Sequence, residues 1–319
     1  MFHRIDHIMI CVPELQQGIA QYRRLGFTVH PGGDHPGKGT HNAIAFNNDD
    51  YLELLAIRDA AEERAAAPWG PDLAGYIAAG GGIRYVIVQS DDLAADVAAM
   101  RARGVDVTDA VEGNRRTPGG EVNRWKAAFL GPKNQLPLFF IEHLTPMAER
   151  RRRLTASEPP MTHNPLPVTG SEARITHNPS PISAVGNANG AYALERAYIV
   201  TPDVRTDAPK YAKVLGIPAP EPHVGTVIKA DMSVLEIGPT GLGIVTPVAP
   251  GPAKDALERR GPGPFQALYR TTSMGAAARW MEEHGIPPPV RGTRNTGEQA
   301  MLVTPEHALG AYIGFVGPE

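Results

Sequence analysis

Two polar residues stand inside apolar stretches near the start of the chain and are the first candidates for chemistry. His7 lies within residues 5–12, a run of β-branched and apolar residues that predicts a buried strand. Glu53 lies within residues 51–57, a second run of the same kind. An ionised carboxylate in a buried strand is costly unless it is paired or bound to a metal ion. A buried histidine also needs a hydrogen-bonding partner. Both residues therefore mark a candidate site.

Strand periodicity predicts which side chains these two residues accompany. Successive side chains point to opposite faces of a strand, so we expect Ile5, His7 and Met9 to share one face. By the same rule Glu53 shares its face with Tyr51. Residues 31–39, rich in glycine and proline, are expected to form a loop between two strands.

The elements that position these residues recur four times along the chain. Each unit begins with a strand, continues with a helix that ends at a glycine, and closes with further strands. The units cover residues 1–57, 82–143, 194–248 and 264–319. A recurring order of this kind predicts the architecture more strongly than any single strand does. We therefore predict an α+β fold built from four tandem βαβββ modules in two domains, residues 1–143 and 194–319.

A segment rich in proline and asparagine, residues 144–193, is predicted to be the linker between these domains. It begins with four consecutive arginines at positions 150–153. We interpret this run as a solvated helix face, with an anion site as the alternative.

Composition limits the classes of function. The 319 residues suit two domains, and 42% hydrophobic and 20% charged residues are typical of a globular protein with a sizeable core. A net charge of -3 gives no indication of nucleic acid or an acidic membrane as a partner. The single cysteine, Cys11, excludes an intrachain disulfide and a Cys-rich metal site. No signal peptide or long apolar span is found, so we expect a cytoplasmic protein.

Four motifs resemble those of the vicinal oxygen chelate superfamily, in its glyoxalase-like domain branch. They are Ile-Asp-His-Ile at 5–8, Gly-Thr-His-Asn at 39–42, Tyr-Leu-Glu-Leu-Leu at 51–55 and Phe-Phe-Ile-Glu at 139–142. The motifs lie in residues 2–143, and from 190 to 319 the resemblance rests on the repeat. In this superfamily two modules pair around one cup-shaped site that often holds a divalent metal. The resemblance thus implies two glyoxalase/dioxygenase-like domains with cup-shaped mixed sheets.

Carried over position by position, the resemblance implies that His7, Glu53 and Glu142 hold the metal. One nitrogen and two oxygen ligands suit Mn, Fe, Ni, Co or Zn, with open positions for water or substrate. Glu142 and His143 point to opposite faces of one strand, and we choose Glu142 because it matches the family motif. Tyr85 stands opposite His7, where the family often has a histidine. A weaker site, another third ligand such as His41 or His143, or no metal therefore all stay open.

The remaining candidate residues surround this predicted site. Glu53 and Glu142 are the candidate catalytic residues, as carriers of a proton. The candidate substrate-binding residues are His41, at a glycine-flanked strand end, Tyr85, and Arg124, which would meet an anionic substrate.

Two functions are compatible with these residues. The first is a metal-dependent lyase or isomerase acting on a small oxygenated substrate, in which the metal polarises a carbonyl or stabilises an enolate. The second is a metal-free protein that binds or sequesters a small molecule. A ring-cleaving extradiol dioxygenase is disfavoured because the second half has Arg196 and Gln266 where the first has His7. The cups can pair within the chain or across a homodimer.

Overall fold

The computed structural model describes residues 2–67, 70, 72–155 and 186–319. In the first half the order strand, helix, three strands occurs twice, as the modules predict. Its elements are β1 (Phe2–Cys11), α1 (Leu15–Arg24), β2 (Val29–His35), β3 (Thr40–Phe46), β4 (Tyr51–Ile57), α2 (Ala60–Ala66), α3 (Leu73–Ala78), β5 (Gly82–Ser90), α4 (Leu93–Ala102), β6 (Val111–Arg116), β7 (Val122–Phe129), the 3-10 turn η1 (Pro132–Asn134), β8 (Leu138–His143) and α5 (Met147–Thr155).

The second half repeats the same order twice, with one helix between the two modules. Its elements are β9 (Ala191–Val200), α6 (Val204–Leu215), β10 (His223–Gly225), β11 (Ala230–Ile237), β12 (Thr240–Pro247), α7 (Pro252–Arg260), β13 (Gly263–Thr271), α8 (Met274–Glu283), β14 (Val290–Thr293), β15 (Gln299–Val303) and β16 (Tyr312–Val316).

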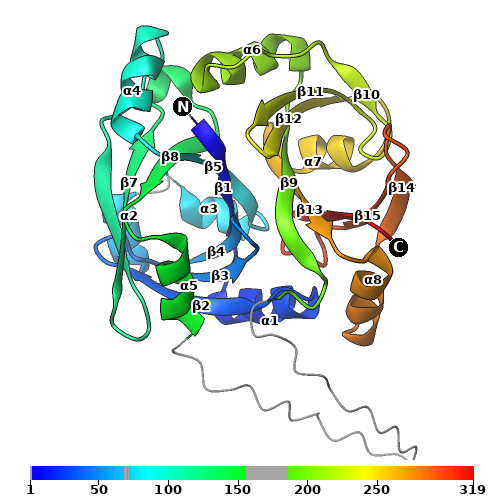
Figure 1. Ribbon diagram of the computed structural model, residues 1–319, viewed down its shortest axis with the longest axis horizontal. Helices are drawn as coiled ribbons and strands as arrows, with labels where there is room; N and C mark the ends of the chain where they lie inside the picture. Colours follow the sequence, from blue (N-terminus) through cyan, green and yellow to red (C-terminus); the bar gives the residue numbers. More distant parts are fainter. Residues whose placement is uncertain (1, 68–69, 71, 156–185) are drawn as a thin grey trace, which may run out of the picture.

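Each half forms one mixed eight-stranded sheet. The first closes into a barrel in the order β1-β4-β3-β2-β6-β7-β8-β5, and the second is open, in the order β10-β11-β12-β9-β13-β16-β15-β14. In both, the first strand of a module pairs in parallel with the last strand of that module. Figure 1 shows the two sheets beside one another. The predicted α+β fold with two cup-shaped mixed sheets is confirmed.

One hydrophobic core lies between the two sheets and contains residues of both. The ring of Phe27 packs 5.4 Å from that of Tyr269 and 6.0 Å from that of Phe315, measured between centroids. The Tyr22 hydroxyl of α1 donates to the carbonyl of Ala308 in the second half at 3.0 Å. The two sheets are therefore held together by apolar packing rather than by a few surface contacts.

A β-bulge in β1 determines which residues enter the first barrel. Ile5 and His7 pair with consecutive residues of β5, so Asp6 between them has no partner there. The extra residue shifts the phase of side-chain alternation. Ile5 consequently packs in the core between the sheets, whereas His7 faces the interior of the barrel. The prediction that Ile5 and His7 share a face is wrong for this reason.

Two predicted irregular segments contain regular structure. The expected loop 31–39 is shorter than predicted, because β2 continues to His35 by pairing with β3. The predicted linker 144–193 contains helix α5 and the first residues of β9, and its residues 156–185 lie outside the described part of the chain. Among the described residues, no helix is both long and apolar enough to cross a membrane.

The contact between β1 and the turn that follows β11 gives a test of how the two halves are joined. Gly238 has φ +57°, and a Cβ there would lie 2.0 Å from the carbonyl oxygen of His3. Gly297 also has positive φ, +82°, but a Cβ there meets nothing within 4 Å. An L-residue in this conformation costs roughly 1–2 kcal/mol at either position. We expect Gly238→Ala to lower the free energy of unfolding by about 1–3 kcal/mol more than Gly297→Ala, in urea denaturation. Equal losses would contradict the close approach.

Candidate functional site

The first barrel encloses a small polar cavity of about 40 Å³. Side chains from β1 to β4, from β6 to β8 and from α5 line it. Most of the residues that line the cavity are charged or polar, and several of them are buried. Such groups are stable only when they are hydrogen-bonded or paired, so their partners define the site.

His7 lies between two carboxylates. Its Nδ1 is 2.7 Å from Oδ2 of Asp6, and its Nε2 is 3.1 Å from Oε2 of Glu53. Burial alone would lower the pKa of His7, but the hydrogen bonds and charges of Asp6 and Glu53 raise it above its usual value. A protonated imidazole donates through both ring nitrogens, which is what this position requires.

Glu53 is held in its ionised form. Burial alone would raise its pKa, but the hydrogen bond and charge of His7, with the hydrogen bond of Asn42, lower the pKa to about 2. The amide nitrogen of Asn42 donates to Oε1 of Glu53 at 2.5 Å. His7 and Asn42 therefore each bond one carboxylate oxygen. Glu53 is the carboxylate that lines the cavity.

Asp6 connects His7 to a second histidine. Oδ1 of Asp6 is 2.9 Å from Nε2 of His143, the last residue of β8. Burial alone would raise the pKa of Asp6, yet the two histidines hold it well below its usual value. The pKa of His143 is lowered, mainly by burial. Asp6 thus orients both imidazoles without lining the cavity itself.

Two arginines bring positive charge to the same cavity. Arg115 of β6 is buried, and Arg150 of α5 is 6% exposed, with its guanidinium 5.5 Å from the centroid of the Tyr51 ring. Within the described residues, the Nε atoms of both have no hydrogen-bond partner. The interpretation of the arginine run as a solvated helix face is wrong for Arg150, because its side chain is buried and lines the cavity. The two guanidinium groups therefore line the same cavity as the Glu53 carboxylate.

His35 is a further histidine of the site. Its Nε2 is 3.9 Å from Oε1 of Glu53, and its Nδ1 is 3.0 Å from the hydroxyl of Thr40. Burial lowers the pKa of His35 to about 3, so the ring is neutral at physiological pH. The sequence does not indicate His35 as a site residue, because it lies in a segment whose glycines and prolines predict a loop.

Glu142 does not enter the cavity, and the choice of Glu142 over His143 is corrected. Oε2 of Glu142 accepts from the backbone N–H of Leu93 at the start of α4, and its Oε1 accepts from Lys126 at 3.1 Å. Alternation along β8 places Ile141 and His143 inside the barrel and Glu142 outside it. The structure therefore does not bring Glu142 together with Glu53.

His41 and Arg124 also lie outside the cavity. His41 is partly exposed, and its strand neighbour Asn42 lines the cavity instead. Arg124 pairs with Glu112 at 2.6 Å on the outer surface, where both side chains are more than half exposed. In each case the next residue in the sequence, Asn42 or Trp125, lines the cavity. Side chains alternate along a strand, so His41 and Arg124 point away from the interior.

Tyr85 is close to the cavity but is not opposite His7. Tyr85 pairs with Met9, and Ile87 stands opposite His7, because the bulge shifts the register between β1 and β5. The ring of Tyr85 packs 5.7 Å from that of Phe139, which lines the cavity, while Tyr85 itself lines a separate hollow at the junction of the two halves.

The donor set predicted for a divalent metal is not assembled. His7 and Glu53 meet, but Glu142 faces outward, and the space beside them is shared with two guanidinium groups. Within the described residues, no group of three or more His, Cys, Asp or Glu side chains is arranged to hold a metal ion. The residues present do not fit the implied metal, and we derive no step through one.

The chain matches the family model described as a glyoxalase-like domain over residues 5–215. Among solved structures, a hypothetical protein from Staphylococcus aureus is similar, with a TM-score of 0.61 and 13% identity over 98% of this chain and 99% of that one. A mutant 4-hydroxymandelate synthase from Streptomyces coelicolor is similar with a TM-score of 0.59 and 11% identity, over 100% of this chain and 93% of that one. No similar sequence was found among curated proteins. At these identities the structural likeness shows the fold alone.

The charge of His7 predicts a pH-dependent stability. Its folded-state pKa is raised, so its contribution is fully present below pH 6.5 and is lost as pH rises through the folded value. His7→Gln leaves the carboxylates of Asp6 and Glu53 without their shared cation. We expect a loss of about 3–5 kcal/mol of unfolding free energy at pH 6, shrinking at higher pH. Urea denaturation from pH 6 to 10 measures this, with His41→Gln as the control. A loss that does not change with pH would contradict the assignment.

Proposed function

Because the chain belongs to the glyoxalase-like domain family, we propose that its first barrel is the active site of an enzyme that moves a proton on a small oxygenated anion, as an isomerase or lyase does. The observation that supports this best is the hydrogen-bonded chain from Asp6 through His7 to Glu53. Glu53, at the end of this chain, lines the cavity together with the guanidinium groups of Arg115 and Arg150. A proton carrier beside a charge that stabilises an oxyanion is the minimum such chemistry needs.

Glu53 is the base in this proposal. Its low pKa makes it a weak base before a substrate binds. A bound anion adds negative charge beside it and displaces water, and both effects raise the pKa of the carboxylate. Glu53 then accepts a proton from the carbon next to a carbonyl group, and the electron pair of that C–H bond moves onto the carbonyl oxygen. Return of the proton to the other face of that carbon, or to a neighbouring atom, completes the reaction.

Arg115 and Arg150 take the electrostatic role. Their guanidinium groups line the cavity from two different elements, β6 and α5. One can bind the carboxylate of a substrate while the other stabilises the enolate oxygen that forms. His7, fixed by Asp6, keeps Glu53 oriented and moderates its basicity. The small volume of the cavity selects the reacting end of a short molecule.

A metal-free binding protein is the second candidate. The observation in its favour is that each carboxylate oxygen of Glu53 already has a close partner, His7 on one and Asn42 on the other. A carboxylate held in this way is more suited to a structural charge than to accepting a proton. In this case Arg115 and Arg150 bind an anionic ligand and release it without a chemical reaction.

Hydrogen exchange distinguishes the two candidates. Wild-type protein is incubated in D₂O with 2-hydroxy and 2-oxo carboxylates of short chain length, and deuterium uptake next to the carbonyl group is followed by proton NMR. We expect uptake with at least one compound and a loss of about 100-fold or more in Glu53→Gln. Arg115→Gln should weaken the reaction, and Arg124→Gln, on the outer surface, should not. Stabilisation of the wild type by a compound that never exchanges would favour the binding protein.

Metal content tests the donor geometry separately. We expect less than a stoichiometric amount of Mn, Fe, Ni, Co or Zn by plasma mass spectrometry, and no difference between the wild type and His7→Ala. One ion per chain that is lost in His7→Ala would show that these residues do hold a metal ion. It would favour a metal-dependent reaction in place of the metal-free one.

A further inference from the structure

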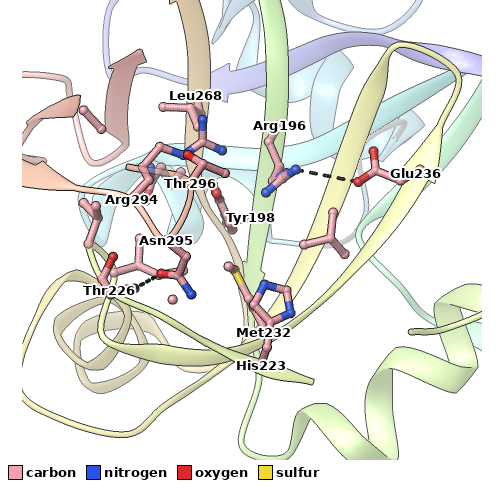
Figure 2. Close-up of a pocket in the computed structure, with 16 residues that line it drawn as sticks. Arg196, Tyr198, His223, Thr226, Met232, Glu236, Leu268, Arg294, Asn295 and Thr296 are labelled. Atoms are coloured by element: carbon pink, nitrogen blue, oxygen red, sulfur yellow. Dashed lines mark hydrogen bonds and ion pairs between the residues drawn. The ribbon is translucent and has the colours of Figure 1, made fainter. Parts of the chain in front are cut away.

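The second sheet encloses a larger cavity that the function proposed above does not use. Its volume is about 240 Å³, against about 40 Å³ in the first barrel. Figure 2 shows Arg196, Tyr198, Met232 and Arg294 around this space. Much of the wall is apolar. The principal apolar residues are Tyr198, Ile228, Met232, Val234, Leu268 and Ala300.

Strand β12 has a glycine where β4 has Glu53, and the carboxylate that lines this cavity is Glu236 of β11. β12 pairs in parallel with β9 as β4 does with β1, but it carries Gly241 and Gly243. A Cβ at Gly241 would lie 3.0 Å from Nε of Arg196, and one at Gly243 would lie 2.6 Å from the ring of Tyr198. The glycines therefore make room for a cation and an aromatic ring. Arg196 and Gly243 take the positions of His7 and Glu53, so the histidine–carboxylate pair of the first barrel is not repeated here.

Arg196 is a cation with little compensation. Its nearest carboxylate is Glu236, at 3.7 Å, and the Glu236 side chain is 66% exposed (Figure 2). A long and exposed ion pair contributes little. Arg294, which also lines the cavity, is different because it pairs with Glu195 at 2.6 Å and Glu298 at 2.8 Å. In the described part of the chain, Nε of Arg196 has no hydrogen-bond partner.

Gln266 adds a buried polar group beside this cation. It is 3% exposed, it lines the cavity, and its Oε1 has no hydrogen-bond partner among the described residues. Arg196 and Gln266 lie on the antiparallel strands β9 and β13. In the register of this pair Arg196 is opposite Leu268 and Gln266 is opposite Tyr198. They are diagonal neighbours, roughly 7–8 Å apart along the sheet. An amide left unsatisfied in such a place is costly unless a ligand meets it.

We propose that this cavity binds an organic anion with an apolar body, a carboxylate and a hydroxyl group. The carboxylate pairs with the guanidinium of Arg196. The hydroxyl meets the amide of Gln266, since a hydroxyl can both donate and accept. The apolar body packs against Met232, Val234 and Leu268. A cavity of about 150 Å³ is enough for benzene in a protein interior, so a substituted ring fits the larger volume here. The proposal is independent of the reaction assigned to the first barrel.

Calorimetric titration with the 2-, 3- and 4-hydroxybenzoates tests this proposal on the full chain. We expect at least one isomer to bind with a Kd of about 1 mM or below. The matching hydroxybenzamide, which lacks the charge, and benzoate, which lacks the hydroxyl, should each bind about tenfold more weakly. The proposal is wrong if no isomer binds at millimolar concentration. It is also wrong if the hydroxybenzoate, the hydroxybenzamide and benzoate bind equally well.

Variants assign the binding to this cavity. Arg196→Met should weaken the hydroxybenzoate about tenfold and leave the hydroxybenzamide unchanged. Arg205→Met, an exposed arginine on α6, is the matched control. If Arg115→Met abolishes binding and Arg196→Met does not, the anion sits in the first barrel and the proposal is wrong.

A second variant keeps the test valid if Arg196→Met does not fold. Gln266→Glu has nearly the same shape and places a carboxylate next to Arg196, so the cation is compensated internally. It should abolish binding of the hydroxybenzoate while the protein keeps its circular dichroism spectrum. Undiminished binding in a folded Gln266→Glu protein would overturn the proposal.

Discussion

The bulge at Asp6 is the constraint on which the first barrel depends. Regular alternation along β1 would send the side chains at positions 6 and 7 to opposite faces of the sheet. The extra residue lets the Asp6 carboxylate reach both His7 and His143. A buried ion of this kind is tolerated only if further groups compensate it. His7 and His143 supply that compensation, and Glu53 in turn pairs with His7 on its other side.

The same frame holds two cavities of different chemical character. In the first, imidazoles and carboxylates alternate in short hydrogen bonds, from His143 through Asp6 and His7 to Glu53. In the second, glycines replace the corresponding side chains, and a single poorly compensated arginine stands in an apolar space. Strand order and pairing are shared, whereas chemistry is decided by a few inward-facing positions.

The sequence predicts the order of strands and helices well, because each module has its own strand and helix patterns and a glycine where its helix ends. It also places His7 and Glu53 in buried strands, and the structure brings them within hydrogen-bonding distance. The sequence-based prediction fails where the choice between two adjacent residues of a strand decides which side chain points into the barrel. Glu142 and His143 are such a pair, and a bulge that shifts phase leaves no clear mark in composition.

Long-range assembly explains the other missed residues. Arg115 stands in a polar, exposed-looking hairpin, and Arg150 follows the last strand of the barrel in a run of like charges. Neither has a local pattern that predicts burial. Only the packing of α5 against the barrel gives Arg150 its place beside Tyr51. The expectation of a solvated helix face fails for Arg150, whose side chain is buried in the lining of the first barrel.

The shared core between the sheets links the two cavities energetically. Phe27, Tyr269 and Phe315 belong to one cluster, so neither half can unfold without exposing apolar surface of the other. A molecule bound in one cavity therefore raises the free energy of unfolding of the whole chain by mass action. Occupancy of the second cavity would in this way lengthen the lifetime of an intact first barrel without any change in its geometry.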